Sequence, residues 1–570
     1  MICCVGAELA KYVLVSDSSL EANYRNVPLL EFLPSAPANS VPGSFYYFLK
    51  GPTHPPLPNG EASVAPYSVR KIEAALLTRN RREDVVVAHP KYLQSFIKDD
   101  TEVIAVSTMD PLGLGPLTMS YYMLMGDKGG AWVKREWLAL IARLNALRKG
   151  KKAKLVVGGP GVWEFTIMPE EVERESIDYA FQGEADDVVC DLFEQIATGS
   201  IDHTKFYEGY ATVDDNFHRT YVDHPRFLSR DRSIGTSAPL TAIPQIVRPA
   251  IKSMVEIMRG CGIGCDFCEV TLRPLRYYSI ENILKEVQVN VQQGHFSNAW
   301  LHTDEIFGFR HTRPTFEPNE EALIELFTKV MSVPGVRRTN PTHGRISPAT
   351  AYPELIKKLS DIVHAGPNNW IGVQVGVETG SDRLAKTHMP NKTLPLHVGP
   401  DGSWARIVLE GTMNMTKYWW RPAITVQTGQ RDETDEDNWD TVSLINKMSG
   451  SYSDGRPLEF TVTPMQNVPL GLIKSGGFSL NMLTEAQLAV YYASYRHLYK
   501  MALRNSRSTG TGNVFVRLGI AGILPFGGWA LMKFIEHLVK KKGLDVEKVK
   551  RYGMDGIPRR PEAKEILAKV

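Results

Sequence analysis

The sequence predicts an α/β protein: an N-terminal doubly wound parallel sheet, a partial (β/α)6 barrel, and a helical C-terminal region. Three observations predict this fold class. Short apolar runs alternate with amphipathic segments at helical spacing, which is typical of parallel sheets. Glycine-rich turns follow several of the apolar runs, and three clustered cysteines follow another. At 570 residues, the chain is also too long for one hydrophobic core.

Composition narrows the class of protein. The chain is 43% hydrophobic and 22% charged, as in ordinary globular proteins, and its formal net charge of +2 gives no reason to expect a nucleic-acid partner. Six cysteines fit a reducing compartment better than a disulfide scaffold. The N-terminus lacks the basic stretch and apolar core of a signal peptide. We therefore expect a cytoplasmic protein.

Residues 1–75 are rich in proline, and we expect an irregular N-terminal segment there. Residues 76–200 form the expected doubly wound domain, followed by a polar linker over 201–245. Ligands of such sheets bind at the carboxyl ends of the strands, where glycine turns allow close approach. Strands are expected at residues 84–88, 103–107, 154–160 and 177–184, and the turn residues expected to line a binding site are Asp110, Gly113, Gly158, Gly159, Gly183 and Glu184.

The barrel is expected over residues 246–475, and its first strand runs into a glycine-rich loop that carries Cys261, Cys265 and Cys268. This CxxxCxxC spacing suits a metal centre, because soft thiolates select iron–sulfur clusters, zinc or copper. A structural zinc site is closed by a fourth ligand, whereas an iron–sulfur cluster held by three thiolates leaves one iron open. The spacing alone is compatible with a zinc site and with an iron–sulfur cluster.

Polar side chains follow two later strands of the expected barrel. Asp304 and Glu305 end an apolar run, and Glu378 ends another, in the phrase Gly-Val-Glu-Thr-Gly-Ser that closes with Ser381. Carboxylates at strand ends accept hydrogen bonds from amines and hydroxyls. The alternative is a set of solvated acids. Barrel strands are expected at residues 252–258, 299–307, 336–346, 370–378, 423–429 and 458–464.

The order and spacing of these motifs resemble the radical S-adenosylmethionine (SAM) superfamily over residues 250–470. The resemblance implies that Cys261, Cys265 and Cys268 hold a [4Fe-4S] cluster whose open iron binds SAM. It also implies that Asp304 and Glu305 lie near the SAM amino group, and that Glu378 and the Ser381 turn lie near its ribose. An electron donor of the ferredoxin or flavodoxin type is implied as a partner.

Residues 80–200 resemble the cobalamin-binding domain found before many radical SAM barrels, through the Gly-Gly-Pro phrase at 158–160 and Asp-Tyr-x-x-x-Gly-Glu at 178–184. The DxHxxG motif that supplies a histidine to cobalt is absent. Cobalamin therefore either binds without a histidine ligand, or the domain is a scaffold that covers the barrel mouth.

The expected C-terminal region, residues 476–570, contains a tyrosine-rich helix and an apolar stretch over 514–539. Pro525 and Gly527-Gly528 split this stretch, so we expect an apolar hairpin and not a bilayer-spanning helix. It either lies in a membrane interface, giving peripheral membrane contact, or packs on the open barrel.

The sequence thus predicts a radical SAM enzyme that abstracts hydrogen from an unactivated carbon of a hydrophobic, lipid-like substrate. The outcome would be carbon–carbon bond formation, by cobalamin-dependent methylation or by cyclisation or coupling. No residue is assigned to the hydrogen transfer itself. The alternative is a non-catalytic scaffold that binds zinc or a cluster.

Overall fold

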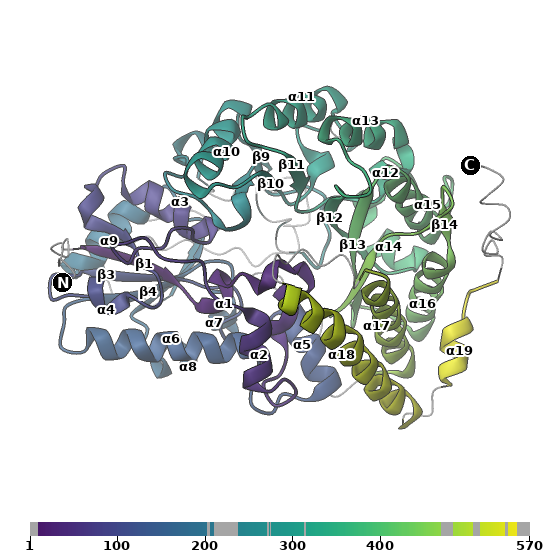
Figure 1. Cartoon of the computed structure of the whole chain (residues 1–570), viewed down its shortest axis with the longest axis horizontal. Helices are drawn as coiled ribbons and strands as arrows, with labels where there is room; N and C mark the ends of the chain where they lie inside the picture. Colours follow the sequence, from purple (N-terminus) through teal and green to yellow (C-terminus); the bar gives the residue numbers. More distant parts are fainter. Residues whose placement is uncertain are drawn as a thin grey trace.

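The protein is described from a computed structural model (Figure 1). The structure describes residues 10–201, 206–209, 238–312 (without 269, 271, 272 and 274), 315–468, 483–505, 514–541 and 545–555. In Figure 1 the N-terminal sheet lies at the left, the barrel occupies the top and right, and the C-terminal helices lie at the lower right.

The N-terminal sheet is parallel and has the strand order β2-β1-β3-β4-β5-β6. Alternate residues of β1 point to opposite faces. Val13 and Val15 pack with α6, whereas Tyr12 and Leu14 pack with α3 and α9. Helices on both faces confirm the doubly wound prediction. The bounds are β1 Tyr12–Ser16, β2 Val85–Val87, β3 Val103–Ser107, β4 Lys154–Gly158, β5 Tyr179–Gly183, β6 Phe206–Gly209, α3 Tyr67–Leu76, α4 Leu93–Phe96, α5 Pro116–Met125, α6 Trp132–Arg148, α7 Glu164–Ile167, α8 Glu170–Arg174 and α9 Val189–Thr198.

Two expectations for this domain are wrong. Residues 1–75 are not irregular throughout, because β1 lies inside the sheet between β2 and β3, and α1 (Ser18–Glu21) and α2 (Gly43–Lys50) follow it. All five residues of β1 are buried, and this short apolar run was obscured by the prolines after it. The expected linker over 201–245 contains strand β6 at the sheet edge. The rest of that linker, apart from residues 201 and 238–245, lies outside the described residues.

Six parallel strands form the barrel wall. One three-stranded sheet has the order β11-β10-β7 and the other β12-β13-β16, and a parallel bridge between His343 and Gln374 joins them. The wall is open between β16 and β7 among the described residues, which confirms a partial barrel. The strands are β7 Met254–Glu256, β10 Asn298–His302, β11 Arg338–Pro341, β12 Ile371–Glu378, β13 Trp420–Thr428 and β16 Thr461–Gln466, and the helices are α10 Ile280–Gly294, α11 Glu320–Met331, α12 Ser347–Ala351, α13 Pro353–Val363, α14 Asp382–His388, α15 Trp404–Lys417 and α16 Asp435–Gly450.

The C-terminal region is helical, with α17 (Glu485–Asn505), α18 (Val514–Lys541) and α19 (Val546–Arg551). The predicted apolar hairpin is wrong, because α18 runs continuously through Pro525. Its contact with α17 explains one of the glycines: a side chain at Gly528 would lie 2.7 Å from the Tyr499 ring. Tertiary packing therefore overrides the local breaking tendency. Among the helices of the described chain, none is long and apolar enough to cross a bilayer.

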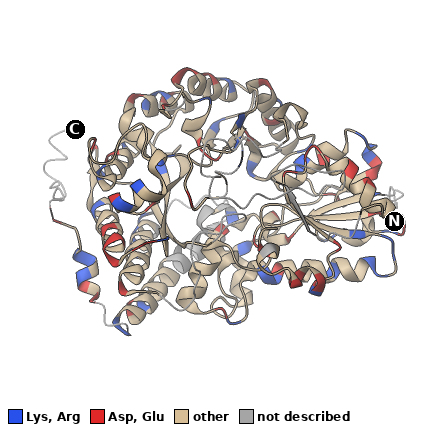
Figure 2. Cartoon of the chain, turned by 180° about the vertical axis from the view of Figure 1, so that it is seen from behind, with Lys and Arg blue, Asp and Glu red and all other residues tan. Residues whose placement is uncertain are grey.

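The charged surface matches the near-zero net charge. Figure 2 shows Lys and Arg interspersed with Asp and Glu over the outer helices. Mixed signs of this kind create no large field of one sign.

Candidate functional site

The cysteine loop leaves the barrel wall just after β7. A small antiparallel ladder between β8 (Met258–Arg259) and β9 (Arg276–Tyr277) closes it. Three glycines in the loop, Gly260, Gly262 and Gly264, have φ of 74°, 68° and 89°. Left-handed backbone of this kind lets a loop fold tightly around its own cysteines.

The three cysteine side chains lie together and unpaired. Cys265 is buried, Cys261 and Cys268 are half-buried, and none forms a disulfide. Burial raises the pKa of the Cys261 thiol, and the neighbouring Cys268 and Cys265 thiols raise it further. The three thiols are therefore close enough to affect one another's ionisation.

The segments after β12 and β13 anchor this loop. The Asp266 backbone N–H donates to the His388 carbonyl over 3.0 Å, and the Asp266 carboxylate contacts His388 Nδ1 at 2.8 Å. Arg431 also pairs with Asp266, at 2.6 Å. The Asn391 amide donates to the Ile263 carbonyl over 2.8 Å. These contacts fix the cysteine loop against the far side of the barrel mouth.

Asp304 lies where the sequence predicts it, at the end of β10 beside the loop. Its carboxylate accepts a hydrogen bond from the Gly260 backbone N–H over 3.0 Å, directly before Cys261. An acidic acceptor therefore stands next to the first cysteine.

Glu305 has a different environment from Asp304. It is 2% exposed, and one oxygen accepts from the Phe307 backbone N–H over 2.8 Å. The other oxygen accepts from Arg345 Nε over 2.9 Å. Both carboxylate oxygens are thus bound within the protein, and the pair with Arg345 is a buried structural ion pair.

Glu378 ends β12 and points toward the cysteine loop. Its two oxygens contact Lys392 Nζ at 2.6 Å and Gln427 Nε2 at 3.0 Å. Burial alone would lower the pKa of Lys392, but Glu378 and the Cys265 thiolate outweigh burial and raise it. Lys392 therefore connects Glu378 electrostatically to the cysteines, and the strand-end glutamate and the loop share one barrel mouth.

Ser381 begins helix α14. Its hydroxyl accepts from the Leu384 backbone N–H over 3.4 Å and donates to Asp437 over 2.5 Å. The residue is 2% exposed. Ser381 thus holds the turn after Glu378 in place by capping α14.

The predicted turn residues of the N-terminal sheet lie at its carboxyl edge. Asp110 accepts from the Gly115 backbone N–H over 2.9 Å and from the Thr118 hydroxyl. Gly159 has a φ of 97°, and a side chain there would lie 2.8 Å from Ser107 Oγ. Gly113 and Gly183 also have positive φ, at 75° and 110°, and Gly158 ends β4. The turns form as predicted, and the Asp110 carboxylate is held by the loop itself.

Glu184 joins the two sheet domains. Its carboxylate pairs with Arg276 at 2.5 Å and with Arg259 at 3.1 Å. Arg259, two residues before Cys261, also pairs with Asp186 at 2.8 Å. Burial alone would raise the pKa of Glu184, but Arg276 and Arg259 outweigh burial and lower it. The carboxyl edge of the N-terminal sheet is therefore held against the base of the cysteine loop.

Sequence reasoning did not predict the ion-pair partners of four basic residues that organise this site: Arg259, Arg276, Arg345 and Lys392. Each acts on a partner distant in the chain, such as Glu305 for Arg345. Two of them gave a sequence signal: Arg259 lies beside the cysteine motif, and Arg345 lies near the end of the expected strand 336–346.

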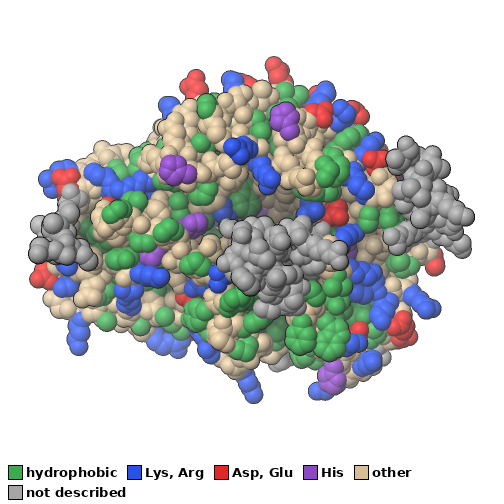
Figure 3. All heavy atoms as spheres, viewed as in Figure 1, with side chains coloured by type: hydrophobic (Ala, Val, Ile, Leu, Met, Phe, Trp, Pro, Cys, Tyr) green, Lys and Arg blue, Asp and Glu red, His purple; other side chains and the backbone are tan. Residues whose placement is uncertain are grey.

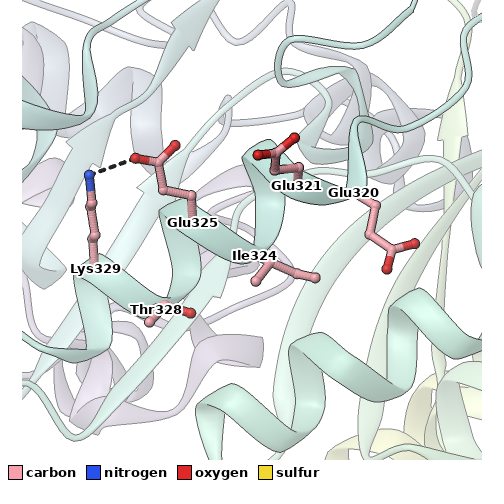
Figure 4. A pocket seen from close by; sticks show the side chains of 6 residues that line it. All are labelled: Glu320, Glu321, Ile324, Glu325, Thr328 and Lys329. Atoms are coloured by element: carbon pink, nitrogen blue, oxygen red, sulfur yellow. Dashed lines mark hydrogen bonds and ion pairs between the residues drawn. The ribbon is translucent and has the colours of Figure 1, made fainter.

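One surface depression lies away from the loop, on the outer face of α11 (Figure 4). Glu325 and Lys329 form an exposed ion pair there at 2.6 Å, one helical turn apart. Pairs of this kind are common on solvated helices, and an exposed pair on one helix does not by itself indicate a functional site.

Comparisons with known proteins give distant matches. No family model matches the chain. A UPF0313 protein of Chromobacterium violaceum is 30% identical over 136 residues, so the match spans 19% of this chain and 18% of that protein.

Two solved structures of the radical S-adenosylmethionine methyltransferase TsrM of Kitasatospora setae also align. The structure with tryptophan substrate and a SAM analogue matches with a TM-score of 0.48 and 13% identity, over 85% of this chain and 77% of that one. The structure with cobalamin and a [4Fe-4S] cluster matches with a TM-score of 0.48 and 12% identity, over 94% and 99%. Likeness at this level carries no argument about chemistry, which rests on the residues of this chain.

Proposed function

We propose that this protein is a radical SAM enzyme that removes hydrogen from an unactivated carbon. The observation that carries the proposal is the loop of three unpaired cysteines at the end of the first barrel strand, beside Asp304 and facing Glu378. When bound, a [4Fe-4S] cluster with SAM supplies the primary carbon radical that such a reaction needs.

The donor set fits a cluster better than a single metal ion. Within the part of the chain that the structure describes, no three His, Cys, Asp or Glu side chains converge closely enough to hold one ion. Zinc requires its thiolates about 2.3 Å from a common point. In a cluster, each thiolate binds a different iron, so convergence is unnecessary. This favours the cluster over the zinc scaffold.

The residues around the loop have distinct proposed roles. Asp304 orients the loop through Gly260 and offers an oxygen to the SAM amino group. Glu378, held by Lys392 and Gln427, is placed to accept from the SAM ribose. Lys392 also balances negative charge beside Cys265. Ser381 acts indirectly by fixing the turn after Glu378.

The reaction proposed to follow hydrogen removal is carbon–carbon bond formation on a hydrophobic substrate, by cyclisation or coupling. A ferredoxin or flavodoxin type of protein is the proposed electron donor. A second candidate is cobalamin-dependent methylation. It is favoured by the Glu184–Arg259 pair, because this pair holds the carboxyl edge of the parallel sheet beside the cysteine loop. Ligands of such sheets bind at that edge.

The test is anaerobic purification from cells supplied with cobalamin, followed by iron, sulfide and corrinoid analysis. We expect about four irons per chain and SAM cleavage on reduction. Replacing Cys261, Cys265 and Cys268 by alanine should remove both. Stoichiometric corrinoid would select methylation, whereas its absence would select cyclisation or coupling. A colourless zinc protein that does not cleave SAM would overturn the proposal.

A further inference from the structure

A large apolar groove lies between the N-terminal segment and the C-terminal helices. Its volume is about 800 Å³. Residues from the segment before β2 form one wall, α17 and α18 form the other, and Tyr121 of α5 and Val462 of β16 also line it. Volumes of this size are typical of sites for small molecules.

The lining of the groove is uncharged. Among the described residues that line it, none is Asp, Glu, Lys or Arg. Phe526 on its rim is 69% exposed, Phe32 is 39% exposed and Phe534 is 38% exposed. Figure 3 shows hydrophobic side chains gathered on the surface over α18. Exposed aromatic residues that gather around one hollow indicate an apolar ligand, because water is a poor partner for such a surface.

A buried hydroxyl points to the same conclusion. Tyr495 lines the groove and is 5% exposed, and its hydroxyl has no hydrogen-bond partner of ordinary geometry. The Tyr121 hydroxyl is the neighbouring polar group. In the absence of a ligand, the two hydroxyls can interact with each other. A buried unpaired hydroxyl costs free energy. An oxygen atom on the ligand would recover that cost.

The groove lies beside the open edge of the barrel. Val462 and Thr463 belong to β16, which pairs with β13 on one side and is the last strand of its sheet. β13 in turn pairs with β12, which carries Glu378. The groove therefore borders the strand that ends the wall on the open side of the barrel.

We propose that this groove binds a long aliphatic chain of the substrate, with an oxygen function placed at Tyr121 and Tyr495. This inference rests on the proposed function, and it assigns the substrate class to an oxygen-bearing aliphatic chain that enters at the open barrel edge.

The test measures binding of cis-parinaric acid, a fluorescent long-chain fatty acid, to the reconstituted full-length protein. We expect a saturable rise in fluorescence that dodecan-1-ol reverses. Ala530→Trp should weaken binding about tenfold or more, because the indole occupies the groove from an exposed lining position. His537→Trp places the same indole on the same helix, outside the lining, and should bind as the wild type does.

Equal binding by the wild type and Ala530→Trp, or no saturable binding, would overturn the proposal. The proposal would also be overturned if the protein sedimented with phosphatidylcholine vesicles but showed no saturable binding of the fatty acid. That result would assign the aromatic rim to bilayer contact. Probe binding does not require the cluster. Saturable binding by a protein that cannot cleave SAM would therefore support the binding groove and reject the proposed function. SAM cleavage by a protein that shows no saturable binding would support the proposed function and reject the binding groove.

Discussion

Glu305 and Arg345 form a structural ion pair, whereas the neighbouring Asp304 lies at the cysteine loop. Their ion pair is 2.9 Å long, and both side chains are at most 3% exposed. Asp304, the adjacent acid, contacts the cysteine loop instead. Neighbouring carboxylates in the sequence thus have separate roles, because successive residues at a strand end point in different directions.

Removing only Arg345 should leave the buried Glu305 carboxylate without its ion-pair partner. We expect Arg345→Met to destabilise the protein by about 3–5 kcal/mol, measured by urea denaturation. Adding Glu305→Gln should restore much of the loss, because the uncompensated charge disappears. Lys357→Met, in an exposed pair with Asp361, is the control and should change little. A double variant as unstable as Arg345→Met would contradict this account.

His497 should make stability depend on pH. It is buried between Ser449 Oγ at 3.0 Å and the Phe460 carbonyl at 2.9 Å, and burial lowers its pKa to about 3. The folded protein therefore keeps this imidazole neutral, whereas the unfolded chain binds a proton below about pH 6.5. Stability should be fully present above that pH and fall as the pH decreases toward 3.

We expect a loss of about 2 kcal/mol from this histidine between about pH 6.5 and pH 5. Denaturation midpoints at several pH values measure it. His497→Gln should flatten the dependence in this window, and the exposed His537→Gln should not. An unchanged slope in His497→Gln would show that other groups cause the effect.

At the scale of elements, helix α18 depends on one glycine and not on its neighbour. A side chain at Gly528 would lie 2.7 Å from Tyr499 on α17, whereas one at Gly527 would meet nothing within 4 Å. We expect Gly528→Ala to destabilise the protein by about 1–3 kcal/mol. Gly527→Ala should be neutral or stabilising, because alanine favours helix. Thermal unfolding compares them, and equal effects would contradict the packing of α18 on α17.

Elements with strong local patterns were predictable from the sequence. Strand β3 has the bounds that the pattern predicts, Val103–Ser107. Strand β1 was missed because four apolar residues before a proline-rich stretch give a weak signal. The hairpin at Pro525 was wrong because contact between α17 and α18, not local propensity, decides that region.

The site was predictable where its signal is local. The three cysteines lie within eight residues of sequence, and Asp304 and Glu378 end apolar strands. The partners of these groups were not predictable. Lys392 reaches Glu378, and Arg345 reaches Glu305, only after the barrel strands assemble. Long-range ion pairs leave no spacing in the sequence that would reveal them.

At the scale of the whole molecule, Glu184 should hold the N-terminal sheet on the barrel. It pairs with Arg259 and Arg276 at the base of the cysteine loop. We expect Glu184→Gln to weaken both pairs and to increase amide hydrogen exchange in residues 258–268. The exposed Glu170→Gln on α8 is the control. Unchanged exchange in Glu184→Gln would show that other contacts hold the two domains together.

The central claim is that three thiolates hold a cluster with one iron left for SAM. The most direct measurement is the electron paramagnetic resonance spectrum of the reduced, anaerobically reconstituted protein before and after SAM is added. We expect a [4Fe-4S] signal whose g values shift with SAM, and no such signal when Cys261, Cys265 and Cys268 are alanine. A cluster signal that SAM leaves unchanged, or no cluster signal in the wild type, would contradict it.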